Sequence, residues 1–178
     1  MTLLAGPAKA AVTPTFYFIG VPDTGRWCAY ATRAAMLKEE RRLRDSNDGV
    51  FVDYELGNVR VDPQGHPSAL SITVFTESGD WAVTDSYRLK DGAPTHAVRE
   101  VGYADGEGPV RQNFVRTASK WRLQSSAGHA GYIPDFPLYA RISDGPFYPF
   151  VMRVARGGPI PTAGFCNRLA RSTRQGRG

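Results

Sequence analysis

The sequence predicts an α+β domain in which one N-terminal helix packs on a curved, roll-like antiparallel β-meander. Aromatic residues make up 11% of the chain, and 19 glycines and 13 prolines favour short strands joined by tight turns. Apolar residues recur at every second position through most of residues 50–116. An alanine-rich and then charged stretch near the start has the composition of a helix. A β-sandwich or barrel with a helical plug is the alternative fold.

The helix is expected to run from about Arg26 to Arg44. Asp23 or Thr24 can cap its start, because a short polar side chain accepts the free N–H groups of a first helical turn. The charged second half places Glu40 four residues before Arg44, in the favourable order for an ion pair along a helix. This half is expected to face solvent.

Alternating apolar residues predict the strands. They are expected over residues 16–19, 50–56, 59–61, 70–76, 81–89, 95–103, 110–116 and 147–154. Gly57-Asn58, Ser78-Gly79 and Asp91-Gly92 have the composition of hairpin turns. In the order of its elements the chain resembles rolls of the cystatin and nuclear transport factor 2 types. That resemblance rests on element order alone, and it implies a fold without implying an activity.

The organisation expected along the chain is a single domain over residues 13–167. Residues 1–12 are expected to be disordered or the remnant of a signal peptide, because Ala8-Lys9-Ala10 fits the small-x-small cleavage pattern. Residues 168–178 are expected to form a disordered basic tail. We therefore expect a periplasmic or secreted protein, with a cytoplasmic location as the alternative.

The charge distribution bears on partners. The net charge is +5, and the four arginines at 168, 171, 174 and 177 account for all but one unit of it. Residues 1–167 are therefore close to neutral, which predicts no specific nucleic-acid partner. The basic tail, residues 168–178, can attach weakly to polyanions. The chain lacks an apolar run of about 20 residues, so no membrane span is expected. A small-molecule ligand or a protein partner stays open, as does the oligomeric state.

Two cysteines, Cys28 and Cys166, lie near opposite ends of the chain and do not have metal-ligand spacing. In an oxidising compartment they are expected to form a disulfide that ties the C-terminal segment to the early helix. In the cytosol both would be small buried apolar residues.

Motifs with known chemistry are absent from the sequence. It holds no nucleophile elbow, phosphate-binding loop or zinc-protease motif, and its three histidines are far apart. We therefore predict no catalytic motif, no metal site and no cofactor. Asp53 and Glu55 share one side of a predicted strand and are expected to be solvated.

Asp85 is the most informative polar residue. If Ser78-Gly79 forms a two-residue turn, Asp85 lies opposite Ile72 on the stripe that faces the core. An unpaired carboxylate there would be costly, so it needs a partner. A three-residue loop after Leu89 would place Arg99 diagonal to Asp85 on the same face.

A two-residue loop would instead bring His96 opposite Tyr87. We favour the first register, because it turns the apolar side chains of the following strand inward. The expected role of Asp85 and Arg99 is a structural ion pair in or beside the core. The alternative is a ligand pocket that they anchor, with Trp81 and Tyr87 as walls.

The function expected from these features is that of a non-catalytic, exported ligand-binding or accessory protein. The alternative is a small roll-type enzyme, a cyclase, isomerase or hydratase that uses Asp85, Tyr87 or His96. Sites of that kind need no contiguous motif.

Overall fold

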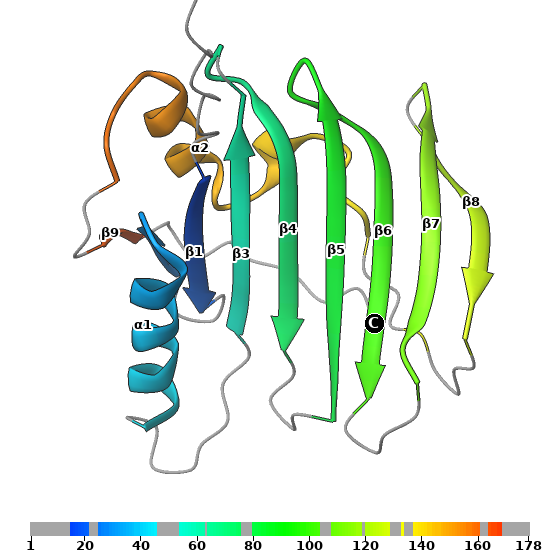
Figure 1. The fold of residues 1–178 in the computed structure, drawn as a ribbon, viewed down its shortest axis with the longest axis horizontal. Coiled ribbons are helices and arrows are strands. Elements are labelled where there is room, and N and C mark those ends of the chain that lie inside the picture. The colour runs from blue at the N-terminus through cyan, green and yellow to red at the C-terminus, as the bar shows by residue number, and fades with distance from the viewer. Residues whose placement is uncertain are drawn as a thin grey trace, which may run out of the picture.

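A computed structural model of the chain describes residues 15–21, 25–45, 54–62, 64–75, 80–103, 108–118, 120–128, 133, 137–160 and 164–168. Within these ranges, nine strands form one antiparallel sheet in the order β8-β7-β6-β5-β4-β3-β1-β2-β9 (Figure 1). The predicted terminal segments, residues 1–12 and 168–178, lie outside the described residues apart from Arg168, which ends the last strand.

The elements confirm an antiparallel β-rich domain and correct the number of helices. The strands are β1 (Thr15–Val21), β2 (Arg26–Tyr30), β3 (Tyr54–Val61), β4 (Pro67–Phe75), β5 (Trp81–Lys90), β6 (Ala93–Tyr103), β7 (Val110–Thr117), β8 (Lys120–Ala127) and β9 (Phe165–Arg168). The helices are α1 (Arg33–Asp45), α2 (Tyr148–Ala155) and the 3-10 turn η2 (Ile142–Asp144). The prediction of a single helix is therefore wrong.

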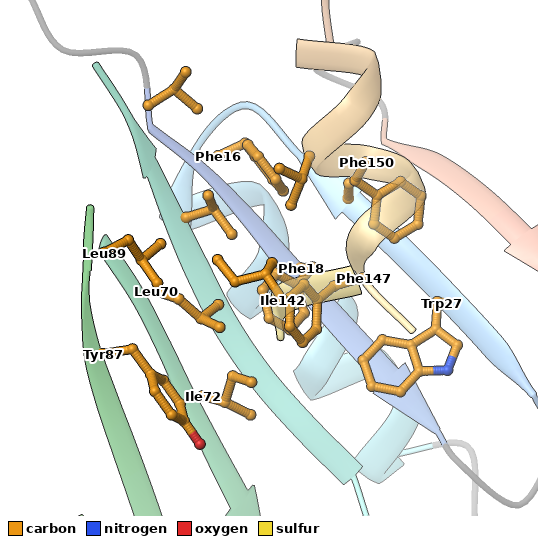
Figure 2. Close-up of a cluster of buried hydrophobic side chains, with 14 of the residues drawn as sticks. Phe16, Phe18, Trp27, Leu70, Ile72, Tyr87, Leu89, Ile142, Phe147 and Phe150 are labelled. Atoms are coloured by element: carbon orange, nitrogen blue, oxygen red, sulfur yellow. The ribbon is translucent and has the colours of Figure 1, made fainter. Parts of the chain in front are cut away.

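One face of the sheet is covered by η2 and α2. Phe16 and Phe18 of β1 and apolar residues of β3, β4 and β5 meet Phe147 and Phe150 there, in the largest apolar cluster (Figure 2). The rings of Phe18 and Phe147 stack with centroids 5.0 Å apart. We refer to this side as the covered face.

The segment predicted as a strand over residues 147–154 forms α2 instead. Phe147, Phe150, Val151 and Val154 have the spacing of one helix face. The first three are buried in the core cluster, and Val154 packs against it. Pro149 lies in the first turn, where proline costs the helix no hydrogen bond.

Helix α1 packs on the opposite face, over β1 and β2. It begins at Arg33 and not at Arg26, and the Thr32 hydroxyl accepts the Ala35 N–H at 3.2 Å as its cap. The expected first turns of the helix are strand β2, which lies hydrogen-bonded between β1 and β9 and is almost entirely buried. Strand pairing on both sides overrides the helix propensity of the alanines.

Gly57 lies inside β3. The prediction that Gly57-Asn58 forms a hairpin turn is therefore wrong. Gly57 is paired with Phe18, and a Cβ at this position would collide with the Phe18 ring. Because the strand is continuous, the buried Val59 and Val61 fix which side chains face the core. Glu55 is consequently turned to the covered face, where it is 4% exposed, contrary to the expectation that it is solvated.

Two further expectations concern acidic residues. Glu40 was expected on the solvated half of α1 and is 8% exposed. Asp53 lies outside the described residues.

Candidate functional site

The predicted polar pair is present, and its register differs in detail from the prediction. Asp85 lies opposite Ile72 across β4 and β5, as a two-residue turn at Ser78-Gly79 predicts. Residues 76–79 themselves lie outside the described ranges. Across β5 and β6, Arg99 lies directly opposite Asp85, whereas the prediction placed it diagonally.

A bulge explains this register. Asp91 and Gly92 form a two-residue turn with positive φ values of 52° and 74°, and Lys90 pairs with Ala93. The pairing then shifts, so that Thr95 is the extra residue on β6, and its hydroxyl donates to the Arg88 carbonyl at 3.2 Å. The turn is therefore the two-residue alternative. The bulge after it turns Ala97 and Val101 inward, as we expected from the three-residue loop.

The pair itself is bidentate and enclosed. Arg99 Nε donates to Asp85 Oδ1 and Nη2 to Oδ2, both at 2.7 Å. The side chains are 5% exposed for Arg99 and 14% for Asp85. On one side lies the cluster of Val83, Val101 and Val110, and on the other lies the main core. Both carboxylate oxygens are thus engaged by the guanidinium, which makes the burial of each charge tolerable.

Tyr87, two residues further along β5, anchors the segment that covers the sheet. Its hydroxyl accepts the N–H of Tyr139 at 3.2 Å, and the Tyr139 carbonyl accepts the indole N–H of Trp121 at 3.3 Å. Burial, and next the charge of Asp85, raise the pKa of the Tyr87 hydroxyl well above its usual value. The phenol is therefore neutral throughout the physiological pH range.

Rings continue from this anchor across the covered face. Tyr87 lies 6.1 Å from Trp121 and 6.2 Å from Tyr139 between ring centroids, and Tyr139 meets Phe147 edge to face at 5.6 Å. Such contacts add to the stabilisation from burial. The roles of Tyr139 and Trp121 escaped sequence reasoning, because neither residue lies in a motif and 52 residues separate Tyr87 from Tyr139.

Trp81 and His96 do not adjoin the pair. Trp81 lies four residues from Asp85 on the same side of β5, with Val83 between them, and it packs on the valine cluster. His96 pairs with Arg88 and points to the opposite face of the sheet, where it is exposed and its Nδ1 lies 3.1 Å from the Thr95 hydroxyl. The fold therefore brings Asp85, Tyr87 and Arg99 to one face and separates His96 from them.

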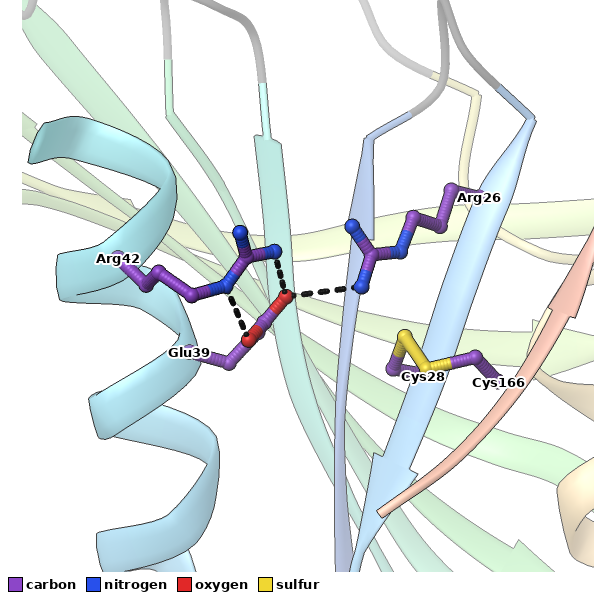
Figure 3. The surroundings of a disulfide bond; sticks show 5 residues. All are labelled: Arg26, Cys28, Glu39, Arg42 and Cys166. Atoms are coloured by element: carbon purple, nitrogen blue, oxygen red, sulfur yellow. Dashed lines mark hydrogen bonds and ion pairs between the residues drawn. A yellow bond between two sulfur atoms is a disulfide. The ribbon is translucent and has the colours of Figure 1, made fainter. Parts of the chain in front are cut away.

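The cysteines meet at the other end of the sheet. Cys28 of β2 and Cys166 of β9 are directly paired and joined by a disulfide (Figure 3). Nearby, the Glu39 carboxylate of α1 accepts two hydrogen bonds from Arg42, at 2.9 and 2.6 Å. It accepts a third from Arg26 of β2 at 3.1 Å. The hydrogen bond from Arg42 is the main cause that holds the pKa of Glu39 below its usual value.

The described ranges hold no group of three or more histidine, cysteine, aspartate or glutamate residues arranged to bind a metal ion. Among their helices, none has the length and apolar character needed to cross a membrane.

Comparison with known proteins adds no further constraint. The chain matches no family model, and neither the curated proteins nor the solved structures include a significant match to it. The assignment of function therefore rests on the chain's own residues.

Proposed function

We propose that this protein is an exported, non-catalytic binding or accessory protein. The observation that carries the proposal is the state of Asp85. Both of its oxygens contact the Arg99 guanidinium in an enclosed position. A general acid or base needs a proton or lone pair directed at a reacting group. In Asp85 each oxygen has one lone pair engaged by Arg99, and the enclosed position limits access to the others.

The neighbouring groups support the same interpretation. The Tyr87 hydroxyl accepts a backbone N–H, and its raised pKa makes it a weaker proton donor than an ordinary tyrosine. His96 faces the other side of the sheet. In this proposal Asp85, Arg99 and Tyr87 hold the covered face together, Trp81 packs the adjoining valine cluster, and binding takes place elsewhere on the surface.

Export is supported by the disulfide. Structural disulfides persist in the periplasm and outside cells, and reducing systems remove them from most cytosolic proteins. The Cys28–Cys166 bond ties the edge strand β9 to β2, so its loss would free an edge of the sheet. A periplasmic or secreted location is the proposed one.

The thiol state of the protein in the cells that make it tests this proposal. Cells are fractionated, free thiols are blocked with an alkylating reagent, and the denatured protein is weighed by mass spectrometry with and without prior reduction. The proposal predicts protein outside the cytosol that gains no label until it is reduced, and then gains two. Cytosolic protein that carries two labels without reduction would overturn the proposal.

A further inference from the structure

Among the described residues, no helix or strand covers the face of the sheet opposite η2 and α2 over β4 to β8. Helix α1 packs on this side over β1 and β2, in a cluster that also includes Leu56 of β3. No described helix or strand lies over the remainder, and in Figure 1 the segment with η2 and α2 passes behind β3 to β5. We call the surface of β4 to β8 on this side, together with the end of β3 that carries Arg60, the open face.

A row of residues that includes three arginines and one histidine crosses the open face from strand to strand. Cross-strand pairing places one residue of each strand in line, in the order Arg60 (β3), Ala69 (β4), Arg88 (β5), His96 (β6), Val115 (β7) and Arg122 (β8). At about 4.8 Å between strands, the row from β3 to β8 is about 24 Å long. Arg60, Arg88 and Arg122 are exposed, and Lys90 and Lys120 lie beside the row on the same side of β5 and β8. We call these five residues and His96 the basic row.

The five Lys and Arg residues of the basic row are not neutralised within the described part of the chain. None of the five forms an ion pair with another described residue. Glu100 is the acidic side chain that the described strands β3 to β8 place on the open face, and it pairs with Arg111 at 3.2 Å. Unbalanced cations along one line create a field that attracts an anionic chain.

A band of hydroxyl and amide groups runs beside the basic row. The Ser71 and Ser86 hydroxyls lie 3.2 Å apart, the Thr73 and Thr84 hydroxyls 2.9 Å apart, and Asn113 Nδ2 donates to the Ser125 hydroxyl at 2.9 Å. Each hydroxyl keeps further donor or acceptor capacity. The open face thus offers cations and hydrogen-bonding groups on one surface.

We propose that the open face binds a linear acidic polysaccharide, whose carboxylates contact the basic row and whose hydroxyls contact the polar band. The proposal deepens the function proposed above and rests on it, because an exported protein meets polymers of this kind outside the cytosol. The planar guanidinium matches a carboxylate in a bidentate manner, and three of the six residues of the row are arginines.

The chemistry of the face disfavours other anionic partners. Single-stranded nucleic acid is bound largely through aromatic side chains that stack on bases. The basic row holds no Phe, Tyr or Trp, and Phe75, on the same face, lies at the far end of β4 from Ala69. An anionic membrane surface is engaged by large apolar side chains beside the cations. The exposed large apolar residue of the described chain, Leu123, pairs with Phe114 of the main core and so points away from the open face.

Titration of the full-length, disulfide-bonded protein with polygalacturonate at about 0.15 M salt tests the proposal. The face variant carries Arg60→Gln, Arg88→Gln and Arg122→Gln. The matched tail variant carries Arg171→Gln, Arg174→Gln and Arg177→Gln and loses the same charge. Circular dichroism checks that both variants are folded. If each exposed ion pair contributes a factor of about two to three, the face variant binds about tenfold more weakly and the tail variant changes less than twofold.

Three further titrations of the same protein use neutral dextran, oligothymidylate and phosphatidylserine vesicles. The proposal predicts no binding to dextran and weaker binding to the other two than to polygalacturonate. Equal losses in the face and tail variants, no binding of polygalacturonate, or tighter binding of oligothymidylate or vesicles would each overturn it. These outcomes are independent of the thiol state in the source cells, so the export proposal and this one can fail separately.

Discussion

Arg99 lies directly opposite Asp85 across β5 and β6, and its Nε and Nη2 atoms each lie 2.7 Å from one carboxylate oxygen. The pair is enclosed between two apolar clusters, and each charge makes the burial of the other tolerable. In the proposed function the pair therefore has a structural role, and binding takes place on another surface.

Loss of one partner of this pair is expected to be costly. Asp85→Ala leaves the Arg99 guanidinium without its carboxylate and should lower the free energy of unfolding by about 3–5 kcal/mol. The double variant Asp85→Leu/Arg99→Leu removes both charges and should stay within about 1 kcal/mol of the natural protein, because apolar residues fill the same region. Urea unfolding of the disulfide-bonded protein measures both.

The Glu100–Arg111 pair is the matched control, since it joins adjacent strands and its side chains are 48% and 58% exposed. Glu100→Ala should cost less than about 1 kcal/mol. If Asp85→Ala costs no more than Glu100→Ala, the pair does not stabilise the fold as described.

Tyr87 should make the stability of the protein fall at alkaline pH. Its pKa is raised in the folded state, so its contribution is full below the unfolded-state pKa of about 10 and is lost as pH rises above it. Tyr87→Phe should cost about 1–2 kcal/mol at pH 8, because it leaves the Tyr139 N–H without its acceptor. The difference from the natural protein should shrink between pH 10 and pH 11 in urea unfolding, and a constant difference would contradict the assigned contact.

Glu39 should have the opposite pH dependence. Its pKa is lowered in the folded state, so its stabilisation is full above the unfolded-state pKa of about 4.3 and is lost as pH falls below it. Glu39→Gln should cost about 1 kcal/mol at pH 7 and nothing at pH 2.5. Asp91→Asn serves as the control, because a turn of this type accepts Asn equally well. A cost of Glu39→Gln that persists at pH 2.5 would show that the ion pairs with Arg26 and Arg42 are not its cause.

The disulfide should contribute strongly to stability. It closes a loop of 138 residues, for which the chain-entropy model gives about 5 kcal/mol. Cys28→Ala/Cys166→Ala should lower the free energy of unfolding by about 4–5 kcal/mol, and hydrogen exchange should speed up first in β9 and β2. A loss below about 1 kcal/mol would mean that the other contacts of β9 suffice to hold the edge strand.

The part of the fold that the sequence predicts well is the meander from β4 to β7. Alternation there is regular and the turns are short, so the pairing of Ile72 with Asp85 follows from the turn alone. The bulge at Thr95 could not be predicted, because it depends on how β6 fits its neighbours. Helix α2 could have been found, since Pro149 precedes the helical spacing of Phe150, Val151 and Val154.

The candidate surfaces were predicted unevenly. Asp85 and Arg99 could be identified because a carboxylate on an apolar stripe requires a partner. The basic row was hidden, since Arg60, Arg88 and Arg122 each have the sequence context of an ordinary solvated strand position. Only the register of six strands brings them into line. The near-neutral charge of residues 1–167 is a sum over both faces of the sheet. It therefore does not reveal that unpaired basic residues lie together on the open face.

The most direct test compares the two faces of the sheet in one binding experiment with polygalacturonate. The Asp85→Leu/Arg99→Leu variant alters the covered face and leaves the basic row intact, whereas the Arg60→Gln/Arg88→Gln/Arg122→Gln variant does the reverse. The structural role of the pair predicts unchanged affinity for the first variant and about tenfold weaker binding for the second. A folded first variant that loses binding, with the second unaffected, would contradict it and place the functional site at Asp85 and Arg99.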